Sequence, residues 1–465
     1  MNRCNFFGML AAIGAAMLFA ACGDGNPNPA DVLPSAEQTA WQRMEYCMFV
    51  HFGPNTFTDS EWGTGAEHPA VFAPEALDCR QWAATARAAG MKGIILTAKH
   101  HDGFCLWPSR LSTHTVRESG WRDGRGDVLR ELADACRAYG LRFGVYVSPW
   151  DRNHPAYGTP AYNEVFAGML REVLTGYGEV FELWLDGANG EGPGGKRQEY
   201  DWELFHRTIR ACQPQTIVFS DVGPGCRWIG NERGYAGETC WARLDTAGFE
   251  PGAGAPPTDT LNRGNVFGAA WVPGEADVSI RPGWFYSPAT DAKVKRVEEL
   301  FDIYCASVGR NANLLLNVPA DRRGRIPAPD SLRLVELRGM LDCVFARNLS
   351  AGAAEALTDG DPDTYREFGA RGGAFEIALP EPVTFDMLVL QEYTPCGQLV
   401  AGWEAEYRGA DGEWIRFVRG TTIGHKRIVR FDPVTARRVR VRITRALGRC
   451  RIAEAGLYCT AEGAR

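Results

Sequence analysis

The sequence has no excess of positive charge. Its 465 residues carry 50 Lys and Arg against 57 Asp and Glu, which gives a net charge of -7. Nucleic-acid binding depends on basic patches that neutralise phosphates, so this balance argues against a nucleic-acid partner. It is compatible with a neutral substrate.

Closely spaced metal-binding cysteines and nucleotide-binding glycines are also missing. The cysteines are scattered singly, without a CxxC pair or a Cys/His cluster of zinc-binding spacing. No GxGxxG motif opens a helix after a strand, which weakens a dinucleotide-binding alternative. We expect buried thiols, an occasional disulfide and no cofactor.

Long apolar runs are absent after the N-terminus, so no later segment is expected to span a bilayer. Asn2 and Arg3 precede an apolar run that ends in Ala20-Ala21-Cys22. A basic start, a short apolar stretch and small residues before the cut predict a signal peptide.

A cysteine directly after two alanines further predicts a bacterial lipoprotein. Residues 1–22 would end in the lipidated Cys22, and residues 23–36 would form a flexible tether. The protein would then lie in the cell envelope, periplasmic or surface-exposed, and would meet a membrane only through its lipid anchor. Phe19 is unusual in such a motif, and the alternative is an ordinary cleaved signal without lipid.

Helical and apolar segments alternate through residues 37–348. At least four amphipathic stretches end at Gly or Pro and lead into short apolar runs, which end in polar or aromatic residues; further apolar runs lie at residues 47–51 and 314–317. Apolar runs between helices predict parallel strands buried on both faces. Their number favours an α/β fold with a (β/α)₈-like barrel over an open doubly wound sheet.

The pattern changes in residues 349–465. Short segments of alternating polarity, such as residues 375–379 and 439–443, are separated by turn residues such as Asp411-Gly412. This pattern predicts a C-terminal antiparallel β-sandwich.

Polar residues gather where the predicted barrel strands end. Because the carboxyl ends of barrel strands surround one pocket, these residues are expected to share a ligand. Individually, each has a simpler explanation as a local hydrogen-bonding residue. They are His51, His100, His101, Tyr146, Asp151, Asp186 and Asp221.

Asp186 is the strongest catalytic candidate. It directly follows the apolar segment 183–185, and Gly187 allows other atoms to approach closely. A carboxylate held by a rigid strand suits nucleophilic attack. The alternative is a helix N-cap, but residues 188–192 read as a flexible loop.

Glycoside hydrolysis needs a second carboxyl group that can donate a proton. Glu232 is the best candidate because it lies near another strand end, flanked by glycines and an aromatic residue. Glu238, Asp221 and Glu61 compete for this role, and their spacing does not decide between them.

A metal-dependent hydrolase is the rival class of enzyme, since the histidines and aspartates could bind a divalent ion. Against it, no HxH pair is present, and adjacent His100 and His101 are expected to point in opposite directions on a strand. We expect no metal ion.

Several motifs resemble those of the α-L-fucosidases of glycoside hydrolase family 29. The resemblance covers roughly residues 41–341. The motifs are HFGPNTFTDSEWG (51–63), KHHDGF (99–104), YVSPWD (146–151), WLDG (184–187), SIRPGWFY (279–286) and NLLLNVP (313–319).

This resemblance implies a retaining exo-α-L-fucosidase acting on a fucosylated oligosaccharide or glycoconjugate. Asp186 would be the nucleophile, and Glu232, in RWIGNERG (227–234), would be the acid/base. The residues that match the family's fucose contacts are His51, Glu61, Trp62, His100, His101, Tyr146 and Trp284.

The form of residues 55–59 and of the Glu232 stretch resembles the subgroup that acts on α1,3/4-linked fucose in Lewis-type glycans. Residues 246–264 are a Gly/Pro-rich loop that could border the neighbouring galactose. The C-terminal sandwich resembles discoidin-type or carbohydrate-binding modules, and a structural role is the alternative. The competing functions are a broad-specificity α-L-fucosidase, a related retaining glycosidase and a non-catalytic fucose-binding lectin.

Overall fold

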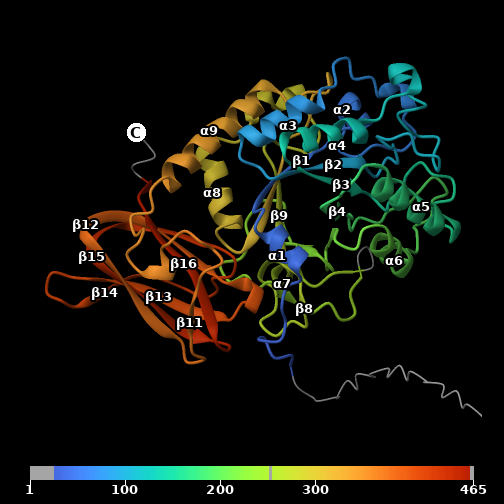
Figure 1. Ribbon diagram of the computed structural model, residues 1–465. Helices are drawn as coiled ribbons and strands as arrows, with labels where there is room; N and C mark the ends of the chain where they lie inside the picture. The colour runs from blue at the N-terminus through green and yellow to red at the C-terminus, as the bar shows by residue number, and fades with distance from the viewer. Residues whose placement is uncertain (1–25, 251–253, 461–465) are drawn as a thin grey trace, which may run out of the picture.

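The computed structural model describes residues 26–250 and 254–460. The predicted signal segment and Cys22 lie outside the described residues. The chain forms a closed parallel barrel followed by an antiparallel sheet domain, which confirms the predicted fold class (Figure 1). Among the described residues, no helix combines the length and the apolar character needed to cross a bilayer.

Eight parallel strands close the barrel. Two of them, β6 and β9, were not predicted individually, because β6 is short and β9 carries two acidic residues. In their order around the barrel the strands are β1 (Tyr46–Val50), β10 (Ala312–Asn317), β9 (Gly274–Ser279), β6 (Cys226–Trp228), β5 (Ile217–Ser220), β4 (Glu182–Trp184), β3 (Arg142–Val147) and β2 (Gly93–Lys99).

Helices surround these strands, and their sequences set where they begin. Asp78, Asp127 and Asp201 cap three of the helices by accepting a backbone N–H from the first turn. The helices are α1 (Ala36–Gln42), α2 (Pro54–Thr58), α3 (Cys79–Ala88), α4 (Val128–Tyr139), α5 (Ala161–Gly176), α6 (Trp202–Cys212), α7 (Thr258–Arg263), α8 (Val297–Ser307) and α9 (Ala328–Phe345).

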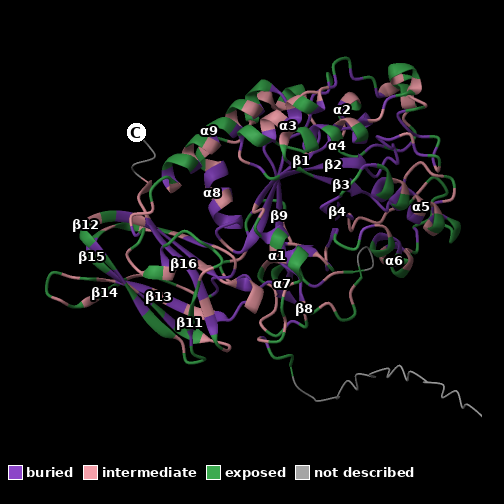
Figure 2. Cartoon of the chain, viewed as in Figure 1, coloured by how far each residue is buried: buried purple, intermediate pink, exposed green. Residues whose placement is uncertain are grey.

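Each barrel strand has an outer face that packs against helices and an inner face that fills the barrel. Along β4, Leu183 belongs to the outer core, whereas Trp184 belongs to an inner aromatic cluster. Figure 2 shows that the strands are buried while the surrounding helices expose their outer surfaces. Because side chains alternate along a strand, Glu182, Trp184 and Asp186 succeed one another toward its carboxyl end.

Helix α1 covers the amino-terminal end of the barrel. Its Trp41 belongs to the inner cluster and donates its indole N–H to Glu182 Oε2 at 2.7 Å. Asn313 Nδ2 donates to the carbonyl oxygen of Trp41 at 2.7 Å. The strand ends that carry the candidate site residues lie at the other, carboxyl end.

The C-terminal part is a six-stranded antiparallel sheet domain with its own apolar core. Bulges interrupt the pairing of its two long strands, β12 and β15. The strands are β11 (Arg366–Phe368), β16 (Cys450–Tyr458), β12 (Gly373–Glu392), β15 (Arg427–Ala446), β13 (Val400–Arg408) and β14 (Trp414–Gly420). A separate two-stranded sheet joins β7 (Arg243–Leu244) to β8 (Ala270–Trp271).

The sheet domain packs against the side and the amino-terminal end of the barrel. Val389 and Ile428 belong to the same apolar cluster as the outer face of the barrel. Beside them, His425 Nε2 lies 3.0 Å from Glu45 Oε1, and Gln398 Oε1 accepts the backbone N–H of Ala242 at 2.7 Å. The two parts thus share apolar and polar contacts.

Candidate active site

Asp186 lies at the carboxyl end of β4, facing side chains from neighbouring strands. Its Oδ2 accepts the hydroxyl of Tyr146, at the end of β3, at 3.0 Å, and lies 3.9 Å from His101 Nε2. Its Oδ1 accepts the backbone N–H of Ala188 at 2.7 Å. Its side chain remains 24% exposed, so a substrate can reach it.

Asp186 does not cap a helix. The next helix, α6, begins at Trp202 and is capped by Asp201. Gly187 follows Asp186, and a Cβ at this position would lie 2.2 Å from Asp221 Oδ2. A glycine is therefore required for the carboxyl groups at the ends of β4 and β5 to approach each other.

His51 extends β1 into the same site. Asn317 donates its amide to Ser279 Oγ at 2.9 Å and to the Trp284 carbonyl at 2.8 Å, so its Oδ1 is the acceptor that faces His51 Nδ1 at 2.8 Å. This network leaves the Nε2 of His51 as a hydrogen-bond acceptor. Burial lowers the pKa of His51 to about 3, so the imidazole is neutral.

His100 and His101 lie together on the same side of the site, so the expectation that they point in opposite directions is wrong. Strand β2 ends at Lys99, and the two rings lie 4.2 Å apart on the following turn. Because the Ser148 hydroxyl donates to the Trp150 carbonyl, it accepts from His101 Nδ1 at 2.7 Å. Burial lowers the pKa of both histidines.

Aromatic rings line the site around Asp186 and the histidines. Trp284 lies 5.1 Å from the His51 ring, and the His100 ring stacks near Tyr146 at 5.7 Å. Trp62, 57% exposed, meets the edge of His101 at 5.5 Å. Apolar faces beside neutral hydrogen-bonding groups suit a neutral, polyhydroxylated ligand.

Glu232 faces the same site from the segment that follows β6. Partial burial raises the pKa of Glu232, a hydrogen bond from the Trp284 side chain lowers it, and the charges of Asp186 and Glu61 raise it further. A carboxyl group with a raised pKa beside a second carboxylate can donate a proton near neutral pH.

The other candidate carboxyl groups lie in different settings. Glu61 is held by the backbone N–H of Trp284, at 2.7 Å from Oε2, whereas Glu238 pairs with Arg310 beside the sheet domain at 3.7 Å. Asp151 is buried and pairs with Lys99, the last residue of β2, at 3.3 Å. It therefore supports the turn that follows β2 and does not face a ligand.

Three supporting residues were not singled out from the sequence. They are Ser148, which follows β3, Asn317, which ends β10, and Asp277, which lies within β9. Asp277 accepts the indole N–H of Trp228 at 2.9 Å, and burial together with the charge of Glu232 raises its pKa. An acidic residue within a barrel strand was the feature of the sequence from which Asp277 could have been identified.

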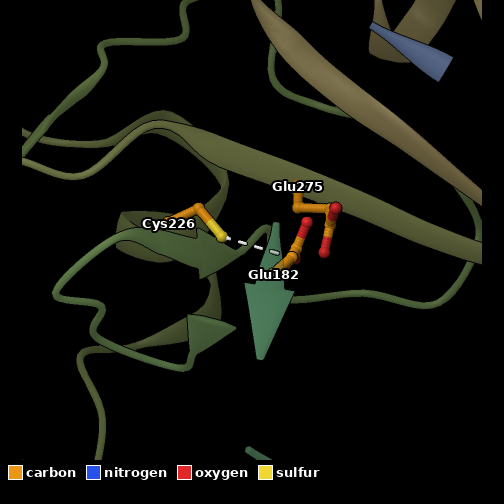
Figure 3. A group of neighbouring side chains, drawn as sticks. All are labelled: Glu182, Cys226 and Glu275. Carbon is orange, nitrogen blue, oxygen red and sulfur yellow. Dashed lines mark hydrogen bonds between the residues drawn. The ribbon is translucent and has the colours of Figure 1, made fainter. Parts of the chain in front are cut away.

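One group among the described residues has the composition and spacing of a metal site: Glu182, Cys226 and Glu275, whose ligand atoms lie within 4.8 Å of one another. Figure 3 shows the two carboxyl groups face to face, with the thiol of Cys226 directed at Glu182. Indole N–H groups already occupy one oxygen of each carboxyl. The group lies below the site, inside the barrel.

Asp221 gives a prediction about stability. Burial, followed by the charge of Asp186, raises its pKa from 3.8 to about 6. A carboxyl group whose pKa rises on folding holds its proton more tightly in the folded state. The folded protein therefore loses stability as pH rises from about 3.8 to about 6.

Asp221→Asn removes this loss. We expect its free energy of unfolding to exceed that of the wild type by roughly 1–3 kcal/mol at pH 7, and the difference to shrink toward pH 4. Denaturant unfolding of both proteins at each pH measures it. A difference that is constant with pH would contradict the assignment.

Known proteins resemble the chain across both parts. The family model described as Alpha-L-fucosidase matches residues 30–342. Alpha-L-fucosidase 1 of Arabidopsis thaliana is 41% identical over 454 residues, which cover 93% of this chain and 88% of the relative.

Solved structures agree with this match. A glycoside hydrolase 29 family member from an unknown rumen bacterium is 42% identical, with a TM-score of 0.83 over 94% of this chain and 78% of the other. A fucosidase of this family from Ruminococcus gnavus, solved in complex with fucose, is 31% identical, with a TM-score of 0.83 over 95% and 97% of the two chains. The chain therefore belongs to the α-L-fucosidase family of glycoside hydrolases and is an α-L-fucosidase.

Proposed function

We propose that this α-L-fucosidase removes terminal α1,3/4-linked fucose from Lewis-type glycans by a retaining double displacement. Asp186 attacks the anomeric carbon while Glu232 protonates the leaving oxygen, and Glu232 then activates the water that releases fucose. The observation that carries the proposal is the Asp186 carboxylate, held at the barrel mouth among Tyr146, His101 and Ala188.

The hydrogen bonds of Asp186 favour a nucleophile. The Tyr146 hydroxyl and the Ala188 amide each hold one carboxylate oxygen. Donors of this kind hold the carboxylate in place and fix its direction of attack. When the fucosyl ester forms, the carboxylate loses its negative charge. The oxygen that bonds to fucose gives up its hydrogen bond, whereas the other oxygen can keep its own.

The neutral histidines are suited to the sugar hydroxyls. His51 is held through Nδ1 by Asn317, and His101 through Nδ1 by Ser148, so each presents Nε2 as an acceptor. Trp284 offers an apolar surface to the 5-methyl group of fucose, which contributes only about 1–3 kcal/mol of discrimination. The polar contacts therefore supply most of the selectivity.

The linkage preference rests on the surroundings of Glu232. Helix α7 packs directly against Gly230, where an added Cβ would lie 2.5 Å from the Thr258 carbonyl. Phe249 and Trp228 pack against the same small apolar cluster, which includes Leu261 of α7. The described part of residues 246–264 is therefore anchored beside the acid/base segment, where the sugar attached to fucose would lie.

A comparison of substrates tests the linkage. We expect kcat/KM for a Lewis trisaccharide to exceed that for an α1,2-fucosylated disaccharide by at least about tenfold, which corresponds to about 1.4 kcal/mol of transition-state binding. Released fucose is measured under identical conditions, with an aryl α-L-fucoside as a reference for intrinsic activity. Equal values would favour the broad-specificity alternative. Lipidation of Cys22 and an envelope location stay predictions from the sequence.

A further inference from the structure

A pair of buried carboxyl groups lies in the barrel directly below the site. Glu182 begins β4, Glu275 lies near the start of β9, and both side chains are buried. Among the described residues, no Lys, Arg or His forms an ion pair with either group. The pair is therefore not neutralised by a cation.

A shared proton accounts for this arrangement. The two carboxyl groups hydrogen-bond each other, and burial raises the pKa of Glu182 to about 7 and that of Glu275 well above its ordinary range. The thiols of Cys226 on β6 and Cys47 on β1 also face the pair, and burial raises their pKa values as well. Two ionised carboxylates would repel each other in this setting, so at least one stays protonated.

Each carboxyl group also holds one tryptophan. Glu182 Oε2 accepts the indole N–H of Trp41 at 2.7 Å, and Glu275 Oε2 accepts that of Trp184 at 3.0 Å. The Cys226 thiol donates to Glu182 Oε1 at 3.7 Å (Figure 3). The pair thus joins α1, β4, β6 and β9 through hydrogen bonds inside the barrel.

Trp184 connects this pair to the site above it. Its ring stacks on Phe219 at 3.8 Å and on Tyr146 at 5.3 Å. The Tyr146 hydroxyl donates to Asp186, and Asp186 follows Trp184 by two residues on the same face of the strand. The indole is therefore fixed by Glu275 below and supports Tyr146 above.

We propose that Glu182 and Glu275 form a positioning pair, which holds the Trp184 indole and thereby sets the orientation of Tyr146 and the Asp186 carboxylate. This inference rests on the proposed role of Asp186 as the nucleophile. Neither glutamate touches the substrate: Glu275 acts through Trp184, and Glu182 acts through its hydrogen bond with Glu275.

Two variants of Glu275 distinguish a role in positioning Trp184 from a role in packing the barrel interior alone. Glu275→Leu removes the acceptor of the Trp184 N–H, and we expect kcat to fall by about tenfold to a hundredfold with KM changed less than about threefold. Glu275→Gln keeps an acceptor for Trp184 and a donor for Glu182, so kcat should stay within about threefold of the wild type. Equal kcat losses in the two variants, or none in Glu275→Leu, would overturn the proposal.

A double-mutant cycle tests the route through Trp184. Trp184→Phe removes the indole N–H, so combining it with Glu275→Leu should lower kcat little further than either change alone. Fully multiplicative losses would show that the two residues act separately. If Glu275→Leu does not fold, the proposal requires that Trp184→Phe lowers kcat by about tenfold or more while Glu275→Gln keeps it.

Glu392→Gln is the matched control. Glu392 is a buried carboxyl group of the sheet domain, with a pKa raised by burial to about 7, and it accepts the backbone N–H groups of Leu399, Val400 and Gly424. Its replacement should change stability but not kcat. A stoichiometric metal ion in the purified protein, lost together with activity on chelation, would contradict the shared proton. Failure of Asp186 as the nucleophile would appear separately, in the product formed by Asp186→Gly with azide.

Discussion

Replacing Asp186 by Asn is expected to lower kcat for an aryl α-L-fucoside by a factor on the order of 10⁴ or more. The amide is a poor nucleophile and cannot form the fucosyl ester. Its oxygen can still accept a hydrogen bond from Tyr146 or from Ala188, as the carboxylate does, so the melting temperature should change little. Steady-state kinetics and thermal unfolding measure the two effects.

The glycine variant identifies the missing group chemically. In Asp186→Gly, azide can enter the space left by the carboxylate and attack the anomeric carbon from the same face. The product should be β-L-fucosyl azide, with inverted configuration, which NMR distinguishes from the α anomer. Wild-type activity without azide, or rescue that yields the α anomer, would rule out Asp186 as the nucleophile.

The same variants test the non-catalytic alternative. A fucose-binding lectin would hold fucose without turnover, and its wild-type protein would show no release of an aryl leaving group. An enzyme that has lost only its nucleophile should still bind fucose, because the imidazoles of His51 and His101 are held by Asn317 and Ser148. Calorimetry on Asp186→Asn measures this binding.

The sequence predicted the barrel from apolar runs, and its two missed strands explain where this approach fails. Strand β9 reads Gly-Glu-Ala-Asp-Val-Ser, so it lacks the continuous apolar run of a strand buried on both faces. Its polar residues face the barrel interior, where Trp184 and Trp228 satisfy Glu275 and Asp277. Only the closed barrel brings these partners together.

Most candidate site residues were proposed because strand ends meet at one edge of a barrel. Their orientations depend on turns that the alternation of a strand does not govern. His100 and His101 follow the last residue of β2, and the turn brings both rings to one side. Likewise, Glu232 and Glu238 are close in sequence, but Glu238 pairs with Arg310 beside the sheet domain.

Replacing Glu232 by Ala is expected to affect substrates according to their leaving groups. For a Lewis trisaccharide, whose leaving oxygen needs a proton, kcat/KM should fall by roughly 10²–10⁴. For an aryl fucoside with a good leaving group the loss in kcat/KM should be much smaller, because bond cleavage needs little protonation. Similar losses for both substrates would contradict the assignment.

The pH profile gives a second test of the same residue. Partial burial, with the charges of Asp186 and Glu61, raises the pKa of Glu232. A general acid works in its protonated form, so the wild-type kcat/KM for the trisaccharide should fall tenfold per pH unit above this pKa. Glu232→Ala should lose this alkaline decline.

Azide separates Glu232 from the neighbouring carboxyl groups. Once the fucosyl ester has formed on Asp186, azide can occupy the space left by Glu232→Ala and attack from the face opposite the ester, which yields α-L-fucosyl azide with retained configuration. Asp221→Ala and Asp277→Ala leave Glu232 in place, so azide should not accelerate them. If Asp221→Ala gave the α-azide instead, the proton donor would lie at the end of β5, beside Gly187.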